Sequence, residues 1–70
     1  MTTLETKILR ALAAYKVERG MSAQAATAWA NANLQRGITK WKEARGKIPS
    51  QDRMYDGDAF NALKQWAQSA

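Results

Sequence analysis

The chain of 70 residues carries 11 lysines and arginines against 6 aspartates and glutamates, a net charge of +5, and it contains no cysteine and no histidine. The absence of both residue types excludes disulfides, zinc sites built on thiolates or imidazoles, and catalytic sets that depend on histidine. A chain of this length forms one domain, residues 1–70, around a small core. No apolar run reaches membrane-spanning length and no signal-peptide pattern is present, so we expect a cytoplasmic protein without a membrane partner.

The first predicted helix covers residues 3–19. Thr2 and Glu5 have the spacing of a capping box, which starts a helix. Gly20 supplies the left-handed residue that commonly ends one. The lysines and arginines of this segment lie mostly off its apolar face. Four large apolar residues recur at helical intervals and form that face: Leu4, Ile8, Leu12 and Tyr15.

A second helix is predicted over residues 22–31, with Ser22 as its N-cap. The segment is rich in alanine, which favours the helix, and Trp29 is its one large residue. Tryptophans on apolar helical stripes most often belong to the core. If Trp29 is exposed instead, it becomes the best candidate for a partner contact or a homodimer interface.

Two interpretations apply to residues 22–45. In the first, one long helix covers the whole range, and Gly37 is a weak point within it. In the second, which we prefer, the chain breaks at residues 31–33, Asn-Ala-Asn, and Asn33 caps a third helix over 34–45. Either interpretation places Leu34, Ile38 and Trp41 on the inner side of the helix.

The last quarter of the chain combines a connecting segment with a final helix. Residues 47–55 contain Pro49 and several polar residues, which is typical of a loop or a short hairpin. A helix then follows over 57–68, with Asp56 or Asp58 as its cap and an apolar face on its inner side. The fold class is therefore all-α, with three to four short helices.

The positive charge is concentrated between Arg36 and Arg53. In the break interpretation, residues 22–30 and 34–45 are the two helices of a helix-turn-helix, and the second is the recognition helix. Arginine and lysine can contact phosphates or guanine edges, and glutamine can pair with adenine. A basic helix face that serves only solubility is the competing explanation. The residues that we expect to contact nucleic acid are Gln35, Arg36, Thr39, Lys40, Lys42, Lys47 and Arg53.

Residues 38–66 contain four short motifs: Ile38-x-x-Trp41, Gly46-x-Ile48-Pro49, Arg53-Met54-Tyr55 and Phe60-x-x-Leu63-x-x-Trp66. With these motifs the segment resembles the small winged-helix proteins of the excisionase and MerR type. The resemblance implies a wing at 47–55 and recognition-helix roles for Arg36, Lys40 and Lys42, with Arg53 on the wing. It further implies a DNA-binding regulator of a phage or mobile element, acting as an excisionase or a small repressor.

An alternative from another class is a phage-encoded inhibitor that binds and blocks a host protein complex, in the manner of anti-CRISPR or transcription-blocking proteins. A compact basic chain of this length suits either function. We expect neither an enzyme, nor a cofactor, nor a metal site. The cluster of Asp52, Asp56 and Asp58 is explained by turn formation and helix capping, because no phosphate-binding loop accompanies it.

Overall fold

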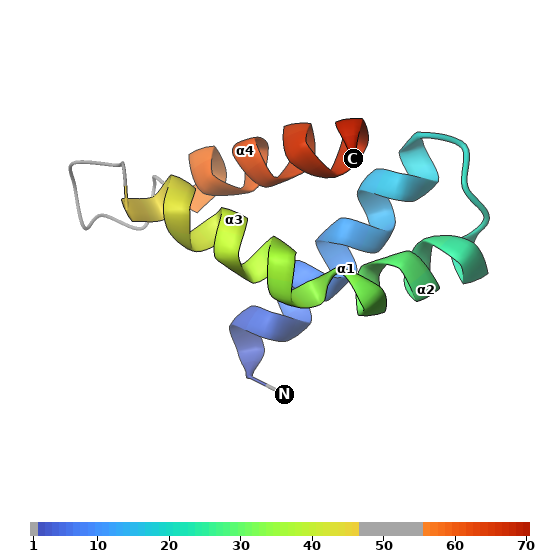
Figure 1. Cartoon of the computed structure of the whole chain (residues 1–70), viewed down its shortest axis with the longest axis horizontal. Helices are drawn as coiled ribbons and strands as arrows, with labels where there is room; N and C mark the ends of the chain where they lie inside the picture. The colour runs from blue at the N-terminus through green and yellow to red at the C-terminus, as the bar shows by residue number, and fades with distance from the viewer. Residues whose placement is uncertain (1, 47–55) are drawn as a thin grey trace.

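The computed structural model describes residues 2–46 and 56–70 (Figure 1). It contains four helices: α1 (Thr3–Glu18), α2 (Ala23–Ala32), α3 (Leu34–Gly46) and α4 (Asp56–Ser69). The all-α prediction is confirmed, and every helix end lies within one residue of its predicted position. Asp56 and Asp58 lie inside α4, so neither occupies the predicted cap position before that helix. The predicted wing at 47–55, with Lys47 and Arg53, lies outside the described residues. Among those residues, no helix combines the length and the apolar character that crossing a membrane requires.

Both predicted ends of α1 are present. The Thr2 side chain accepts a hydrogen bond from the Glu5 backbone N–H at 3.1 Å, which satisfies a donor of the first turn. At the other end Gly20 adopts φ +99°. Its N–H donates to the Val17 carbonyl, and the following N–H donates to the Lys16 carbonyl. This pair of bonds is a Schellman motif, in which glycine avoids the strain of a left-handed residue.

The chain bends between α2 and α3 at a single residue, Asn33. Its φ of −112° and ψ of 11° interrupt the helix, although its carbonyl accepts from the Gly37 N–H at 2.9 Å. The predicted break is therefore present, and the long-helix interpretation is wrong. The Asn33 side chain, however, donates back to the Trp29 carbonyl at 2.9 Å, at the end of α2.

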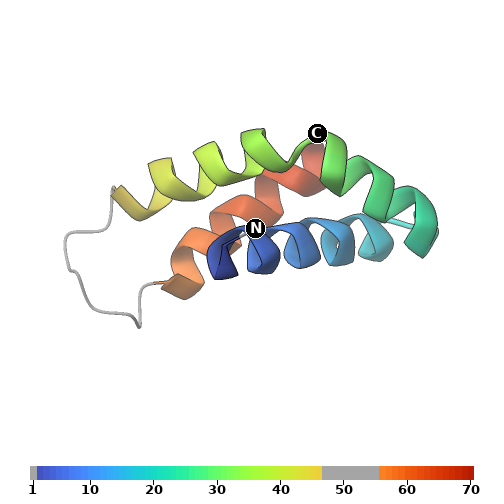
Figure 2. The same ribbon diagram turned by 90° about the horizontal axis from the view of Figure 1, so that it is seen from below.

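This junction differs from a helix-turn-helix, where a turn of three or four residues separates the two helices. Only Asn33 separates α2 from α3. The two helices consequently follow one another as a shallow arch (Figure 2).

The core lies where α1 meets the other three helices. Figures 1 and 2 show α2 folding back along α1, and α4 folding back along α3 and α1. The half-buried tryptophans pack against other aromatic rings, with centroids 6.0 Å apart for Trp29 and Trp66 and 6.0 Å apart for Trp41 and Phe60. Every described helix contributes to the buried apolar set: Ile8, Leu12, Ala26, Ala30, Leu34, Ala59, Leu63 and Ala67.

Helices α1 and α3 pack closely against each other at Gly37, which is buried. A Cβ atom at this position would lie 2.7 Å from Leu12 Cδ1 and 3.3 Å from Ile8 Cγ2. Carbon atoms in contact normally lie about 3.5–4.0 Å apart. Gly37 is thus the residue that lets the two backbones pack together, rather than only a weak point in a helix.

Lys16 corrects the expectation that the cations of α1 lie off its apolar face. Lys16 is only 7% exposed. It follows Leu12 by four residues, as Leu12 follows Ile8, so it lies on the same buried side of the helix. Its ammonium group donates to the Ala70 carbonyl at 2.8 Å and lies 4.3 Å from the centre of the Trp29 ring. The buried cation therefore has both a hydrogen-bond acceptor and an aromatic face.

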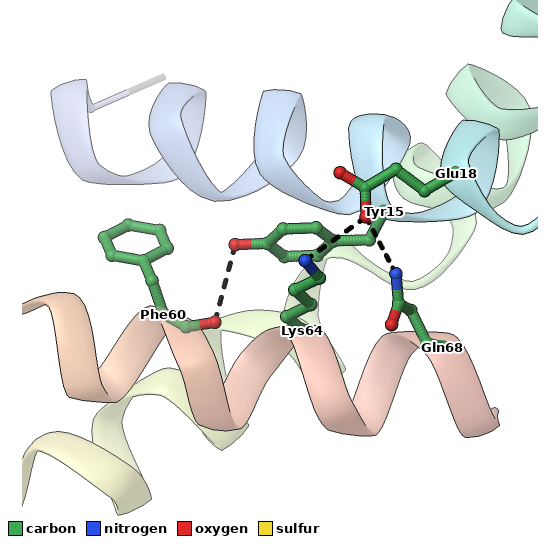
Figure 3. Close-up of polar contacts among 5 residues, drawn as sticks. All are labelled: Tyr15, Glu18, Phe60, Lys64 and Gln68. Atoms are coloured by element: carbon green, nitrogen blue, oxygen red, sulfur yellow. Dashed lines mark hydrogen bonds and ion pairs between the residues drawn. The ribbon is translucent and has the colours of Figure 1, made fainter.

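A strip of polar contacts joins α1 to α4 (Figure 3). The Tyr15 hydroxyl donates to the Phe60 carbonyl at 3.4 Å. The Glu18 carboxylate lies 3.3 Å from the Lys64 ammonium and accepts from the Gln68 amide at 2.9 Å. Because the ion pair is half-exposed, we assign it less than about 1 kcal/mol, and its main effect is on how the two helices are aligned.

Candidate nucleic-acid interface

The outer face of α3 presents the predicted nucleic-acid contacts to solvent. On the opposite side of the helix, Leu34 and Gly37 are buried, and Ile38 and Trp41 are half-buried. In the view of Figure 2, α1 and the first half of α4 lie below α3, and no described element lies above it. Five predicted contacts are exposed in the described part of the chain: Gln35, Arg36, Thr39, Lys40 and Lys42.

Three rows of side chains divide this outer face, because residues four apart lie above one another on a helix. One flank carries Arg36 and Lys40, the central row carries Thr39 and Glu43, and the other flank carries Gln35 and Lys42, which both line the groove described below. At 3.6 residues per turn, Lys40 and Lys42 lie roughly 160° apart around the helix axis. The cations therefore border the face on both sides and do not meet at one point.

The charges on the outer face are only weakly engaged within the chain. The Lys40 ammonium lies 3.9 Å from the Glu43 carboxylate, with the side chains 47% and 57% exposed. An exposed pair at this distance is worth less than about 1 kcal/mol and separates easily. Arg36 and Lys42 form no ion pair with any residue that the structure describes. Both are available to an external anion.

The Lys42 flank borders a surface groove between α3 and the start of α1. The groove is lined by Thr2, Leu4, Glu5, Gln35, Ile38 and Lys42. Within it, the Glu5 carboxylate already accepts a hydrogen bond from the Thr2 hydroxyl at 3.1 Å. A carboxylate near Lys42 reduces the positive potential on this flank, so the Arg36 and Lys40 flank is the more strongly cationic one.

Some cations do not belong to this face. Arg45 is half-buried and engaged in other contacts. Lys7 and Arg10 are exposed on α1. Since α1 meets α3 through Ile8 and Leu12, and Arg10 lies roughly 160° around α1 from each of them, Arg10 points away from α3. This arginine provides a control for charge effects that are not local to α3.

Trp29, the candidate for a partner contact, packs largely inside the chain. It is half-buried between Trp66 and the Lys16 ammonium group. The condition of full exposure, on which a partner role depended, is not met.

Glu43 is the residue of the outer face that the list of predicted contacts omits. It is four residues beyond Thr39, so helical spacing alone places it in the central row. Its carboxylate repels phosphates, which is why the predicted phosphate contacts do not include it.

No cluster of three or more potential metal ligands occurs among the residues that the structure describes. Comparisons of the chain with protein-family models, with curated proteins and with solved structures find no match. The resemblance of residues 38–66 to excisionase and MerR-type proteins therefore stays a prediction.

Proposed function

We propose that the protein is a non-catalytic DNA-binding protein that contacts duplex DNA through the outer face of α3. The observation that supports this proposal is the pair of exposed cationic flanks on a helix whose opposite side is buried. An α-helix with its side chains is about 10–12 Å wide, and the major groove is about 12 Å wide. Flanking cations would then reach the phosphates on the two walls of the groove.

Phosphate contacts are expected to supply most of the affinity. Each cation that neutralises a phosphate releases a bound counterion, and the slope of log K against log salt changes by about −0.9 per contact. Arg36, Lys40 and Lys42 together give a slope of about −2.7. The predicted contacts Lys47 and Arg53 would make the slope steeper.

The regulatory part of the proposal rests on the resemblance of residues 38–66. The resemblance implies an excisionase-like or repressor-like DNA-binding protein, and a chain with one short basic helix face suits that role. The bend at Asn33 departs from the helix-turn-helix, so the proposal depends on α3 itself and not on the geometry of that motif.

Fluorescence anisotropy with a labelled duplex of about 20 base pairs, from about 50 to about 200 mM salt, tests the proposal. Arg36→Ala and Lys42→Ala should each weaken binding and reduce the slope by about 0.9. Arg10→Ala, which removes the same charge from α1, should leave the slope unchanged. Circular dichroism of each variant shows whether the helices are intact.

Two results would contradict the proposal. If no duplex binds at low salt, the alternative of a protein inhibitor of a host complex becomes the better explanation. If Arg10→Ala reduces the slope as much as Arg36→Ala does, the attraction is diffuse and α3 is not the contact surface.

A further inference from the structure

We infer that the central row of α3 reads base edges and that Glu43 selects cytosine within the DNA site. This inference rests on the proposed function, since it names the part of the outer face that would determine sequence preference. The reasoning begins from the position of a carboxylate between two cationic flanks.

A carboxylate on a phosphate-binding face opposes binding unless it is directed away from the phosphates. Glu43 faces away from the buried side of α3, with Lys40 roughly 60° around the axis on one side and Lys42 roughly 100° on the other. Its side chain is therefore directed toward the middle of a groove whose walls these two cations contact. Base edges, not phosphates, occupy that position. The side chain is 57% exposed, and it is therefore accessible from outside the chain.

The chemistry of an ionised carboxylate limits which base edge it can contact. It accepts hydrogen bonds and donates none. In the major groove, guanine presents the acceptors N7 and O6, and thymine presents the acceptor O4 and a methyl group. Adenine has an amino donor at N6, but the acceptor N7 lies beside it and repels a carboxylate. Cytosine presents the N4 amino donor without a neighbouring acceptor, and it is the base that Glu43 fits best.

The contact between Lys40 and Glu43 determines where the Glu43 carboxylate lies in the protein without DNA. At 3.9 Å and half-exposed, the pair holds the carboxylate near the flank when no DNA is bound. When Lys40 turns to a phosphate, this weak pair is lost at little cost, and Glu43 is free to accept from a base. The same step couples a phosphate contact on the flank to a base contact in the centre.

Thr39 supplies the neighbouring contact of the central row. Its hydroxyl donates to the Gln35 carbonyl at 3.0 Å, so its single donor is already used within the helix. The Thr39 methyl group can contact a thymine methyl, and its oxygen can only accept. The row thus offers little to guanine edges, whose acceptors need a donor.

Selection from a duplex library with a randomised centre tests this inference, using the full chain and Glu43→Gln. The wild type should enrich duplexes with cytosine at one position, preferred by about tenfold over guanine or thymine. Glu43→Gln should lose that preference and favour adenine, because an amide pairs with N6 and N7 together. It should also bind unselected duplex more tightly, because a negative charge has been removed.

Glu18→Gln is the matched control, since it makes the same charge change on α1, where Glu18 contacts Lys64 and Gln68. It should keep the wild-type preference. An unchanged preference in Glu43→Gln, or a wild type that binds without preference, would overturn the role of Glu43 but leave the proposed function standing. Failure of the wild type to bind any duplex would overturn both.

Discussion

Replacement of Gly37 by alanine separates two effects that oppose each other at the crossing of α1 and α3. In the interior of a helix, alanine is more favourable than glycine by about 0.8–1.0 kcal/mol. Helix propensity alone therefore predicts a more stable protein. The packing around Gly37 predicts the reverse.

The size of the packing effect follows from the distances at the crossing. The new Cβ would lie 2.7 Å from Leu12 Cδ1, nearly 1 Å closer than a normal carbon contact. Leu12 and Ile8 are both 0% exposed, so their methyl groups would have to shift within the core to make room for the new Cβ. Overpacking by one methyl group in such a site costs about 1–3 kcal/mol. After the gain in propensity, we expect a net loss of about 1 kcal/mol, which lowers Tm by about 4–8 °C in a domain of this size.

Thermal unfolding followed by circular dichroism, together with urea unfolding followed by tryptophan fluorescence, measures this difference. Gly57→Ala is the matched control, because a Cβ at Gly57 in α4 meets nothing within 4 Å. That variant should gain from a few tenths to about 1 kcal/mol. If Gly37→Ala raises Tm as Gly57→Ala does, the two helices can move apart freely and the close crossing does not limit stability.

Two further substitutions address the contacts of α1. Lys16→Met keeps an apolar side chain of similar length but removes the hydrogen bond to Ala70 and the cation over Trp29, and it should reduce the free energy of unfolding in urea by about 1–2 kcal/mol. A more stable Met variant would show that desolvation of the buried ammonium outweighs its contacts. Burial, and secondarily the Glu18 charge, raises the pKa of Tyr15 above 10.0, so the folded state keeps the phenol proton at a pH where the unfolded state releases it. This contribution to stability is fully present below about pH 10 and is lost as pH rises through the folded pKa. Tyr15→Phe should therefore lose less stability between about pH 9 and about pH 11 than the wild type does, and equal losses in urea midpoints would refute that role for Tyr15.

Local signals in the sequence were sufficient to predict where the helices begin and end. The pair of Thr2 and Glu5, the glycine at position 20 and Ser22 each act through neighbours within five residues, so the chain itself specifies them. The apolar rows of α1 and α4 similarly identify the inner side of each helix. The break at Asn33 was visible because asparagine is unusual inside a helix.

Contacts between distant segments could not be derived in the same way. The ammonium group of the buried Lys16 contacts Ala70 and Trp29, which come from other helices or from the end of the chain, and a basic residue is otherwise expected in solvent. The local indication that Lys16 would be buried was its position four residues after Leu12. The role of Gly37 likewise depends on α1, which is some thirty positions earlier in the chain.

In the candidate site, too, local patterns were predictable from the sequence and contacts between distant segments were not. Sequence was sufficient to assign Gln35, Arg36, Thr39, Lys40 and Lys42 to the outside of α3, since their positions follow from the helical period. It did not show that Lys40 pairs with Glu43 or that Lys42 borders a groove shared with α1. The groove depends on how α1 packs against α3, which no local pattern specifies.

The short length of α3 limits how many base pairs its outer face could contact. From Gln35 to Glu43 the backbone rises only about 12 Å, the length of about three to four base-pair steps. So short a footprint recurs by chance many times in any genome. A chain that recognises DNA in this way would therefore need neighbouring copies of itself or a second bound protein in order to bind a single site in a genome.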